Sequence, residues 1–572
     1  MAGDRGSWGS WVEFLLSALG TLVGLGNVWR FPYVCYRSGG GAFLIPFLVA
    51  LLVCGCPILF LETLYCQYSN LGPGKVWVIC PLFKGIGFGM MTMTFVVSVY
   101  YTMIMGWTLH YLAMSFSPTL PWTQCRPDSV QCRQGNVSTA DLGAYNLTGG
   151  ATNDSRLAAN SSFVSPEEEY WFKSVLNVSS GIDHMGGLRW QLLLCLLAAW
   201  VVVFLCLIKG IHSLGKVVYV AATLPYFILT CLLIRGCLLP GAREGLHFYM
   251  VPDWSKLAEF EVWRSAATQV FFSVGLGFGV LSTLASYNKF HNNCYRDAMM
   301  LPVLDCATSI YAGLVIFAYL GHMSHTSGKS IHTVVAEGPG LVFIAYPAAL
   351  STLPLPQLWS VLFFLMLFCV GLDSQFVHIQ TLCAALIDCF PGHPLTSRKT
   401  LLMGCMCVVS FVLGIPLTLE GGSYVLHLMD WYVASMSVML LVFIEIVVLA
   451  WIYGTDRLYQ DVELMIGRRP HVIYKVAWKF VTPIFVLVLW TSGVINFQTI
   501  GSVYPGYPPW ADILGLLISV LSLVPIPIKM VWTLVSLEGS LLQRVKRSVR
   551  PTQQWKPAQS AGLELELEFL NK

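Results

Sequence analysis

The sequence predicts an all-α membrane protein built from twelve transmembrane helices. Hydrophobic residues make up 56% of the 572 residues and charged residues only 11%, whereas about a quarter of a soluble protein is charged. Charge-free stretches long enough to cross a bilayer recur along the chain, for example at residues 38–61 and 400–419. The net charge of +3 is small and the basic residues are scattered, which excludes a nucleic-acid-binding surface.

Hydropathy divides the chain into three parts. We expect a cytoplasmic N-terminus at residues 1–9, a twelve-helix membrane domain at residues 10–535 and a cytoplasmic C-terminal tail at residues 536–572. The spans are predicted at residues 10–33, 41–66, 88–116, 190–208, 215–238, 263–289, 298–324, 358–389, 398–417, 421–452, 474–496 and 509–535. The end of the tail alternates Leu and Glu, which is compatible with disorder or with docking of a cytoplasmic partner.

Basic residues and sequons predict the orientation. Lys and Arg fall in alternate loops, such as the one holding Arg398 and Lys399, and loops of this kind lie in the cytoplasm. Both termini are then cytoplasmic, and residues 117–189 form an extracellular loop in which an oxidising environment would let Cys125 and Cys132 pair. The loop carries five glycosylation sequons, at Asn136, Asn146, Asn153, Asn160 and Asn177. We therefore expect a glycoprotein of the plasma membrane.

Two predicted spans carry glycine clusters that interrupt a helix. They lie in the first and sixth spans, at Gly20, Gly24 and Gly26 before Asn27 and at Gly275, Gly277 and Gly279. Glycine also serves close packing in membrane helices, so one cluster alone does not indicate a break. Two clusters at matching positions of two five-span halves indicate a transporter site, because unwound backbone at membrane depth occurs only where it lines a cavity. Broken helices would offer free amides to a carboxylate and free carbonyls to a cation.

Charged residues inside membrane spans are rare and usually functional, although structural ion pairs also occur. The candidates are Arg30, Asp305, Asp373, Asp388 and Asp430. Asp373 is followed by Ser374 and Gln375, an oxygen-rich group of the kind that replaces the water shell of a hard cation such as sodium. Arg30 follows the first break and, with Asp430 of the tenth span, would form an openable lid.

Three motifs carry a family resemblance. They are Gly24-Leu25-Gly26-Asn27-Val28-Trp29-Arg30-Phe31-Pro32, Gly39-Gly40-Gly41-Ala42-Phe43 and Ser286-Tyr287-Asn288-Lys289-Phe290. On these motifs the sequence resembles the neurotransmitter:sodium symporters from Arg5 to about Val535. The resemblance implies two five-helix repeats of inverted topology, with the first and sixth helices unwound at mid-membrane, and alternating access to one central site.

The resemblance also implies a set of ligands. One sodium ion would bind the Leu22 carbonyl, the Asn27 side chain, Ser273 and Asp305, next to the substrate carboxylate. A second would bind the carbonyls of Gly20, Val23 and Val370 together with Asp373 and Ser374. The substrate carboxylate would dock on the amides of Leu25 and Gly26 and the hydroxyl of Tyr101, in a pocket completed by Gly24, Val97, Phe272, Gly275, Phe278, Ser374 and His378. The outer gate would consist of Arg30 and Asp430, with Phe272 closing the pocket, and the inner gate of Arg5, Tyr287 and Asp388.

Two departures from chloride-dependent members of that family concern anion binding. Those members place tyrosine where Phe47 stands and asparagine where Asp305 stands, beside positions matching Gln269, Ser273 and Ser309. An ionised Asp305 about 5 Å from chloride would repel it by roughly 3 kcal/mol at an effective dielectric of roughly 20, about two decades of affinity. We hypothesise that Asp305 partly replaces chloride, while two sodium ions bind.

Several pocket positions bear on the substrate. Gly24 stands where monoamine carriers have aspartate, so the resemblance disfavours amines that lack a carboxylate. Phe278 stands where glycine and proline carriers tend to have the larger tryptophan, and Gly275 removes another side chain, so a mid-sized neutral amino acid fits best. GABA, taurine or a related ω-amino acid is the alternative, because Gly24 and the Asp373-Ser374-Gln375 run also resemble that branch.

His378 lies one helical turn after Ser374, where relatives have an apolar or small residue. It is either a buried neutral imidazole with a structural role or a polar, pH-sensitive part of the substrate pocket. Asp, Ser and His near one another also occur in hydrolases, but neighbours along one helix do not converge as a triad must.

These features predict a sodium-coupled symporter that imports a small zwitterionic amino acid, and they do not predict an enzyme. A non-transporting family member that acts as a trafficking partner is the alternative, because Leu22, Phe47 and Asp305 depart together from the family pattern. A channel is disfavoured, since gates above and below one small pocket suit alternating access better than continuous conduction.

Overall fold

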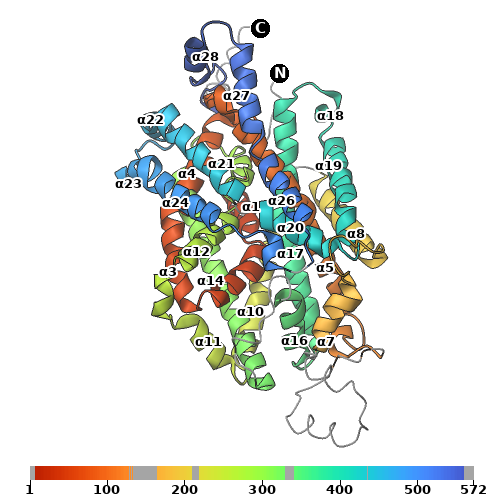
Figure 1. The fold of residues 1–572 in the computed structure, drawn as a ribbon. Coiled ribbons are helices and arrows are strands. Elements are labelled where there is room, and N and C mark those ends of the chain that lie inside the picture. The colour runs from red at the N-terminus through yellow and green to blue at the C-terminus, as the bar shows by residue number, and fades with distance from the viewer. Residues whose placement is uncertain are drawn as a thin grey trace, which may run out of the picture.

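The computed structural model describes residues 7–127, 129, 132, 164–208, 218–328, 331, 341–433, 436–504 and 506–558. Within these ranges the chain is helical throughout, with three isolated β-bridges and no strand. The helices run along one long axis, and the C-terminal helices α27 (Pro525–Ser536) and α28 (Leu541–Ser548) lie at one end of the bundle (Figure 1).

Nine helical runs in the described part of the chain are long and apolar enough to cross a membrane. They are Gly41–Ser69, Pro81–Met114, Trp190–Leu207, Val218–Cys237, Cys294–Thr326, Pro356–Cys389, Lys399–Thr418, Gly422–Ile466 and Val472–Ile495. Two further pairs qualify when each bent pair is taken as one span: Trp11–Leu22 with Gly26–Arg37, bent by 46°, and Pro509–Leu521 with Pro525–Ser536, bent by 45°. Nine to eleven spans result, which agrees with a protein of many membrane helices.

The predicted sixth span is divided between two short helices. Helix α12 covers Phe260–Ser273 and α13 covers Val280–Ala285, so neither is long enough alone to cross a bilayer. Several helices lie outside the predicted spans, among them α11 (Ala242–Met250), α16 (Tyr346–Ser351) and α22 (Thr455–Ile466).

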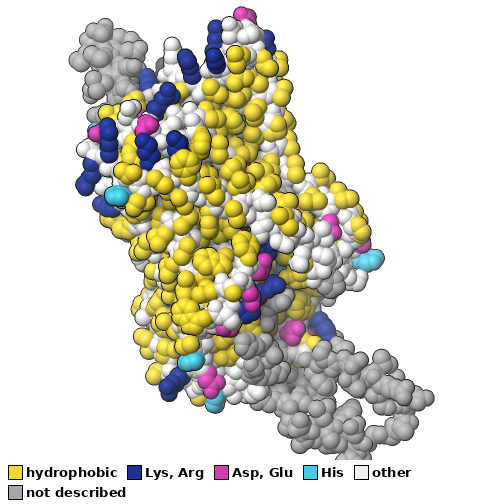
Figure 2. Space-filling view, turned by 60° about the vertical axis from the view of Figure 1, so that its left-hand side comes forward, with side chains coloured by type: hydrophobic (Ala, Val, Ile, Leu, Met, Phe, Trp, Pro, Cys, Tyr) yellow, Lys and Arg dark blue, Asp and Glu magenta, His cyan; other side chains and the backbone are white. Residues whose placement is uncertain are grey.

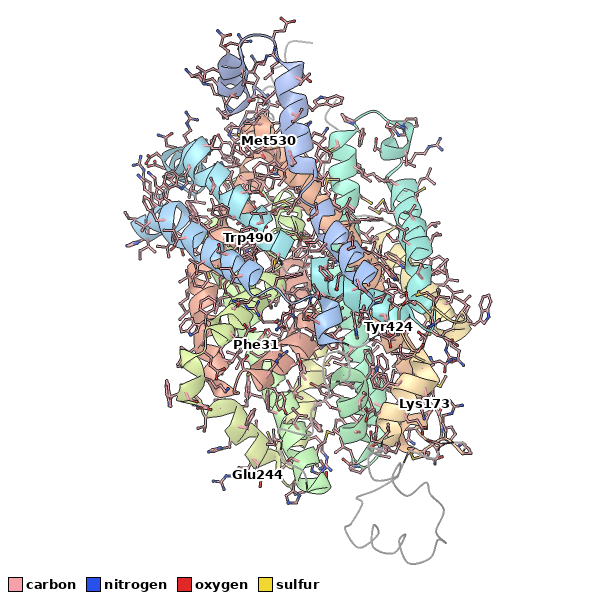
Figure 3. The ribbon with its side chains drawn as sticks, in the orientation of Figure 1. Phe31, Lys173, Glu244, Tyr424, Trp490 and Met530 are labelled. Atoms are coloured by element: carbon pink, nitrogen blue, oxygen red, sulfur yellow. A yellow bond between two sulfur atoms is a disulfide. The ribbon has the colours of Figure 1, made fainter. Side chains whose placement is uncertain are left out.

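The centre of the bundle is formed by α1 (Trp11–Leu22), α5 (Gly85–Met114), α13, α14 (Cys294–Ser327) and α17 (Pro356–Cys389). Helix α17 packs along α5, and α1 lies against both α14 and α17. Phe31, the first residue of α2 (Phe31–Arg37), lies in the middle of the molecule, between Met530 near one end and Glu244 near the other (Figure 3). The start of α2 therefore lies away from both ends of the molecule.

Charge is distributed unevenly over the surface. Figure 2 shows a broad band of hydrophobic side chains, with Lys and Arg gathered mainly at the end where α22 (Thr455–Ile466), α27 (Pro525–Ser536) and α28 (Leu541–Ser548) lie. Such a band is the surface expected of a protein solvated by lipid, and basic residues concentrate on the cytoplasmic side of membrane proteins.

Candidate functional site at two helix breaks

The first break separates α1 from the π-helical turn Gly26–Arg30. The Val23 N–H still donates to the Leu19 carbonyl at 2.8 Å, but Gly24 N–H donates to the Asn27 side chain at 3.1 Å. The Leu25 N–H donates to the Tyr101 hydroxyl of α5 at 3.3 Å. The Gly24 N–H also donates to the Leu22 carbonyl at 2.9 Å, so the amides of the break have left the regular helical pattern.

The second break lies between α12 and α13, and its three glycines all have positive φ, of 63° to 78°. Space also restricts position 277 to glycine, because a Cβ there would lie 2.5 Å from Val442 Cγ2. A Cβ at Gly275 would meet nothing within 4 Å, so this position faces open space. The loop can adopt this shape because these positions are glycine, since residues with L side chains rarely adopt this backbone conformation.

Glu62 holds the second break in place and was missed by our sequence analysis. This fully buried carboxylate accepts hydrogen bonds from the Gly277 N–H at 2.8 Å and from the Ser282 hydroxyl at 3.2 Å. The Thr94 hydroxyl donates to the Phe278 carbonyl at 2.6 Å. A lone acidic residue inside an otherwise charge-free span was the available signal.

Four polar residues from three helical segments meet behind the first break. The Asn27 amide donates to Asp305 Oδ1 at 2.6 Å and to Ser309 Oγ at 2.8 Å, and the Ser273 hydroxyl donates to Asp305 Oδ2 at 2.6 Å. All four side chains are buried. Their oxygens suit a hard cation, and Leu22 ends α1 nearby in sequence.

Of Gln269 and Phe47, the two residues that the sequence comparison associates with anion binding, only Gln269 is polar. Gln269 Nε2 donates to the Gly26 carbonyl at 3.4 Å, and its buried Oε1 has no hydrogen-bond partner within the described residues. The Phe47 ring packs on Phe31, with ring centroids 5.1 Å apart, and brings no hydroxyl. Because the Ser273 hydroxyl proton points to Asp305, it is not directed toward an anion.

A small cavity lies beside α1. Its volume is about 10 Å³, and it is lined by Gly20, Val23, Val370 and Asp373, together with residues of the Val218–Cys237 helix. Asp373 is 2% exposed, and within the described ranges its Oδ1 has no hydrogen-bond partner. A volume of this size holds about one water-sized particle. A buried carboxylate oxygen without a partner beside such a space fits a bound cation.

Several residues predicted to line the substrate pocket lie near one another. The rings of Tyr101 and His378 lie edge to face with centroids 6.0 Å apart. A Cβ at Gly26 would lie 3.2 Å from Phe272, and one at Gly24 would lie 3.0 Å from Ser374 Oγ and 3.4 Å from the Tyr101 hydroxyl. Val97 and Phe278 are buried, at 5% and 6% exposed.

Comparison with known proteins decides the family. The family model of the sodium:neurotransmitter symporters matches residues 5–537. The chain is 42% identical over 562 residues to the sodium- and chloride-dependent glycine transporter 1 of Xenopus laevis, covering 97% of this chain and 88% of the relative. It is also 42% identical over 555 residues to the sodium- and chloride-dependent GABA transporter 2 of Rattus norvegicus, and equally to that of Mus musculus, covering 96% of this chain and 90% of each relative.

The chain belongs to the sodium:neurotransmitter symporter family. It is therefore a multi-pass membrane transporter for a small substrate and not an enzyme, as the sequence predicted.

Several hydrogen bonds join segments of the symporter at one end of the bundle. At the end that carries the N-terminus, the Trp8 N–H donates to the Tyr287 carbonyl at 3.2 Å, and its indole N–H donates to the Leu284 carbonyl at 3.0 Å. Tyr287 also accepts a hydrogen bond from Gln380 Nε2 at 3.0 Å, and Asp388 accepts one from the Gly72 N–H at 3.1 Å. Arg5, the remaining residue expected at this gate, lies outside the described residues.

Trp11 adds a contact at the same end that our sequence analysis did not predict. Its indole N–H donates to Asp297 Oδ1 at 2.9 Å, and the Arg296 guanidinium carbon lies 4.1 Å from the centroid of its ring. Asp297 is buried in the first turn of α14. The start of α1 is thus fastened to α14 through one side chain.

The two residues of the expected outer gate have different partners. The Arg30 guanidinium carbon lies 4.4 Å from the Phe272 ring centroid, and Asp430 Oδ1 accepts a hydrogen bond from the Tyr100 hydroxyl at 3.1 Å. Among the ion pairs between described residues, none joins Arg30 to Asp430.

The long loop of the symporter is described in part. Cys125 and Cys132 are joined by a disulfide, with Cα atoms 5.7 Å apart. The Asn177 side chain is exposed and donates to Glu420 Oε1 at 2.6 Å. The remaining sequons lie outside the described residues, at Asn136, Asn146, Asn153 and Asn160.

Proposed function

We propose that the protein imports a neutral, zwitterionic amino acid across the plasma membrane, driven by two sodium ions and by alternating access. The observation that carries the proposal is the Asp373 site, where a buried carboxylate oxygen without a described partner lines a cation-sized cavity beside the broken α1. Each sodium ion that enters contributes about 2.3 kcal/mol per 100 mV of membrane potential, in addition to its concentration gradient.

The proposed architecture has twelve spans in two inverted five-helix repeats, followed by two helices. Helices α12 and α13 form the sixth span, broken at mid-membrane like the first. The end that carries Trp8 and the tail faces the cytoplasm, which agrees with the basic residues gathered there (Figure 2). Residues 117–189 then form the glycosylated extracellular loop, and the tail is available to cytoplasmic partners.

Sodium binding and substrate binding are coupled because the substrate carboxylate also coordinates a sodium ion. The substrate carboxylate binds the amides of Leu25 and Gly26 and the Tyr101 hydroxyl, and it completes the coordination of a sodium ion held by Asn27 and Asp305. Neither ligand then binds well without the other, which is the free-energy coupling that a symporter needs. The second sodium ion binds at Asp373 with Ser374 and carbonyls of Gly20, Val23 and Val370, where it holds α1 against α17.

We expect chloride to bind near Asp305 more weakly than sodium does. The Asp305 carboxylate lies between Asn27 and Ser273, at the position where an asparagine would leave room for anionic charge. Phe47 removes a hydroxyl donor from the same region. We propose that Asp305 supplies the negative charge that the chloride-dependent relatives take from solution.

The substrate is proposed from the pocket. Because residue 24 is glycine, it offers no carboxylate to pair with the amine of a substrate. The space at Gly275 admits a substrate side chain larger than that of glycine. The named relatives transport glycine and GABA, so an ω-amino acid is the second candidate. The free space beside Gly275 favours a mid-sized α-amino acid.

Uptake into cells expressing the protein tests the function. Labelled neutral and ω-amino acids are offered with sodium or choline, and with chloride or gluconate, while surface expression is measured by biotinylation. We expect accumulation that requires sodium. Normal surface expression without sodium-dependent uptake of any of these substrates would overturn the proposal and favour a non-transporting partner.

A further inference from the structure

Helix α27 carries an apolar stripe that no other described element covers. Ile528, Val531, Trp532 and Val535 are 56% to 72% exposed. Their spacing of three, four and seven residues places them on one face of the helix. With Pro527 and Ser536 they line an open groove along α27. The stripe therefore faces lipid to the end of the helix.

The apolar surface continues beyond the predicted end of the last span at residue 535. Helix α28 follows after a short turn, and its first two residues, Leu541 and Leu542, are 69% and 65% exposed. A capping box formed by Ser540 and Gln543 fixes the start of this helix. Two exposed leucines at a fixed helix start are costly in water and stable at a membrane surface.

Arg544 holds α28 in place relative to α27. Its Nε donates to the Gly539 carbonyl at 2.8 Å and its Nη1 to the Leu534 carbonyl at 3.2 Å. At the other end of the segment, the Thr552 N–H donates to the Val78 carbonyl at 3.0 Å. The leucines are therefore presented by a fixed structure that is bonded at both ends.

Positive charge lies beside this apolar surface. Residues 525–550 contain five basic side chains and one acidic side chain, Glu538, which gives a net charge of +4. The basic residues are Lys529, Arg544, Lys546, Arg547 and Arg550. Lys529 Nζ lies 5.5 Å from the Trp532 ring centroid and 5.0 Å from that of Phe88. Aromatic and basic side chains next to an apolar helix face mark the level of lipid headgroups.

We propose that the end of α27 and α28 form a binding site for anionic phospholipids of the cytoplasmic leaflet, with Leu541 and Leu542 inserted below the headgroups. The net positive charge selects the occupant, because a zwitterionic headgroup gains nothing from it. Each basic residue near an anionic membrane surface strengthens binding by roughly fivefold. The inference rests on the proposed cytoplasmic position of the C-terminal end (Figure 1).

Photocrosslinking of the full chain tests this site. Benzoylphenylalanine replaces Leu542, the protein is placed in nanodiscs of phosphatidylcholine with about 30% phosphatidylserine, and lipid adducts are identified by mass spectrometry. We expect adducts in which phosphatidylserine is enriched several-fold over its share of the bilayer. The enrichment should disappear in the Lys546→Gln, Arg547→Gln double variant, whose exposed side chains are not needed for folding.

The matched control places the same photoreactive residue at Ile513 of α26 (Pro509–Leu521), which is 61% exposed on the lipid-facing part of the span. It should yield adducts that follow the bulk composition. Lipid adducts at Ile513 with none at Leu542 would overturn the proposal. Adducts at Leu542 without phosphatidylserine enrichment, or enrichment that survives the double variant, would do the same. Sodium-dependent uptake by proteoliposomes is a separate readout, so failure of transport and failure of lipid binding are distinguishable.

Discussion

The Asp373 carboxylate lies so close to Gly20 that a Cβ on this glycine would fall 2.7 Å from Asp373 Oδ2. Both residues line the small cavity beside α1. A side chain at this position would therefore displace the carboxylate that faces it, and the space between the two is where we place the second sodium ion.

Substitution of Gly20 by alanine should reduce sodium coupling. The new methyl group must displace the Asp373 side chain, and the cation would lose a ligand. We expect the sodium concentration for half-maximal uptake to rise by roughly tenfold or more, at normal surface expression, because a misplaced charged ligand costs on the order of 1.5–3 kcal/mol. The matched control is Gly493→Ala in α24 (Thr482–Ile495), where a Cβ would lie 3.5 Å from Met436 Cε, an ordinary contact. If uptake by the two variants depended equally on sodium concentration, Asp373 would not be a ligand of the sodium ion.

Replacement of Asp305 by asparagine should make transport depend on chloride. The carboxylate that accepts hydrogen bonds from Asn27 and Ser273 would lose its charge while keeping its shape. Removal of a repulsion of roughly 3 kcal/mol would raise chloride affinity by about two decades. The measurement is uptake in chloride against gluconate: wild type should change little, and Asp305→Asn should lose most of its uptake in gluconate. A wild type that already requires chloride would contradict our account of Asp305.

Trp11→Phe should favour the inward-open state. The variant loses the hydrogen bond to Asp297 but keeps a ring beside Arg296, so α1 is less firmly fastened to α14. A buried hydrogen bond to a charged group contributes about 1.5–3 kcal/mol, so the apparent affinity for extracellular sodium should fall about tenfold. Trp451→Phe is the control, since its indole donates to the Lys479 carbonyl at an exposed position. An unchanged sodium affinity in Trp11→Phe would show that this contact does not hold the inner gate.

His378→Leu should alter substrate selection more than transport itself. The imidazole lies beside Tyr101 and faces the backbone of Ser374, one helical turn earlier. We expect KM for substrates with a hydrogen-bonding side chain to rise by roughly tenfold, in line with the loss of about one hydrogen bond, while KM for alanine stays nearly constant. The ratio of the two KM values within one variant corrects for expression. Equal changes for both substrates would assign His378 a structural role only.

Much of this arrangement could be predicted from local sequence. The glycine clusters indicated the positions where α1 gives way to a π-helical turn and α12 to α13, because glycine is both a poor helix former and the residue that adopts positive φ. Charged residues in apolar spans indicated Asp305 and Asp373 as buried functional candidates, and the family resemblance added Asn27.

Partners far apart in the sequence could not be predicted in this way. Glu62 fastens the second break across 215 residues and Trp11 reaches Asp297 across 286, and hydrophobic periodicity says nothing about which distant side chain will meet another. The division of the sixth predicted span into two short helices also depends on such contacts. Glu62 accepts a hydrogen bond from the Gly277 N–H and Thr94 donates one to the Phe278 carbonyl, and these replace hydrogen bonds that a continuous helix would make.

A last consequence concerns the loop that precedes the Trp190–Leu207 helix. Leu188 pairs with Leu419 in an antiparallel bridge, the Gly421 N–H donates to the Met185 carbonyl at 3.0 Å, and Asn177 bonds to Glu420. These contacts join the loop to the start of α20 (Gly422–Val433), the helix that carries Asp430. A ligand that binds the outer loop would therefore contact the helix that carries Asp430 through these bonds.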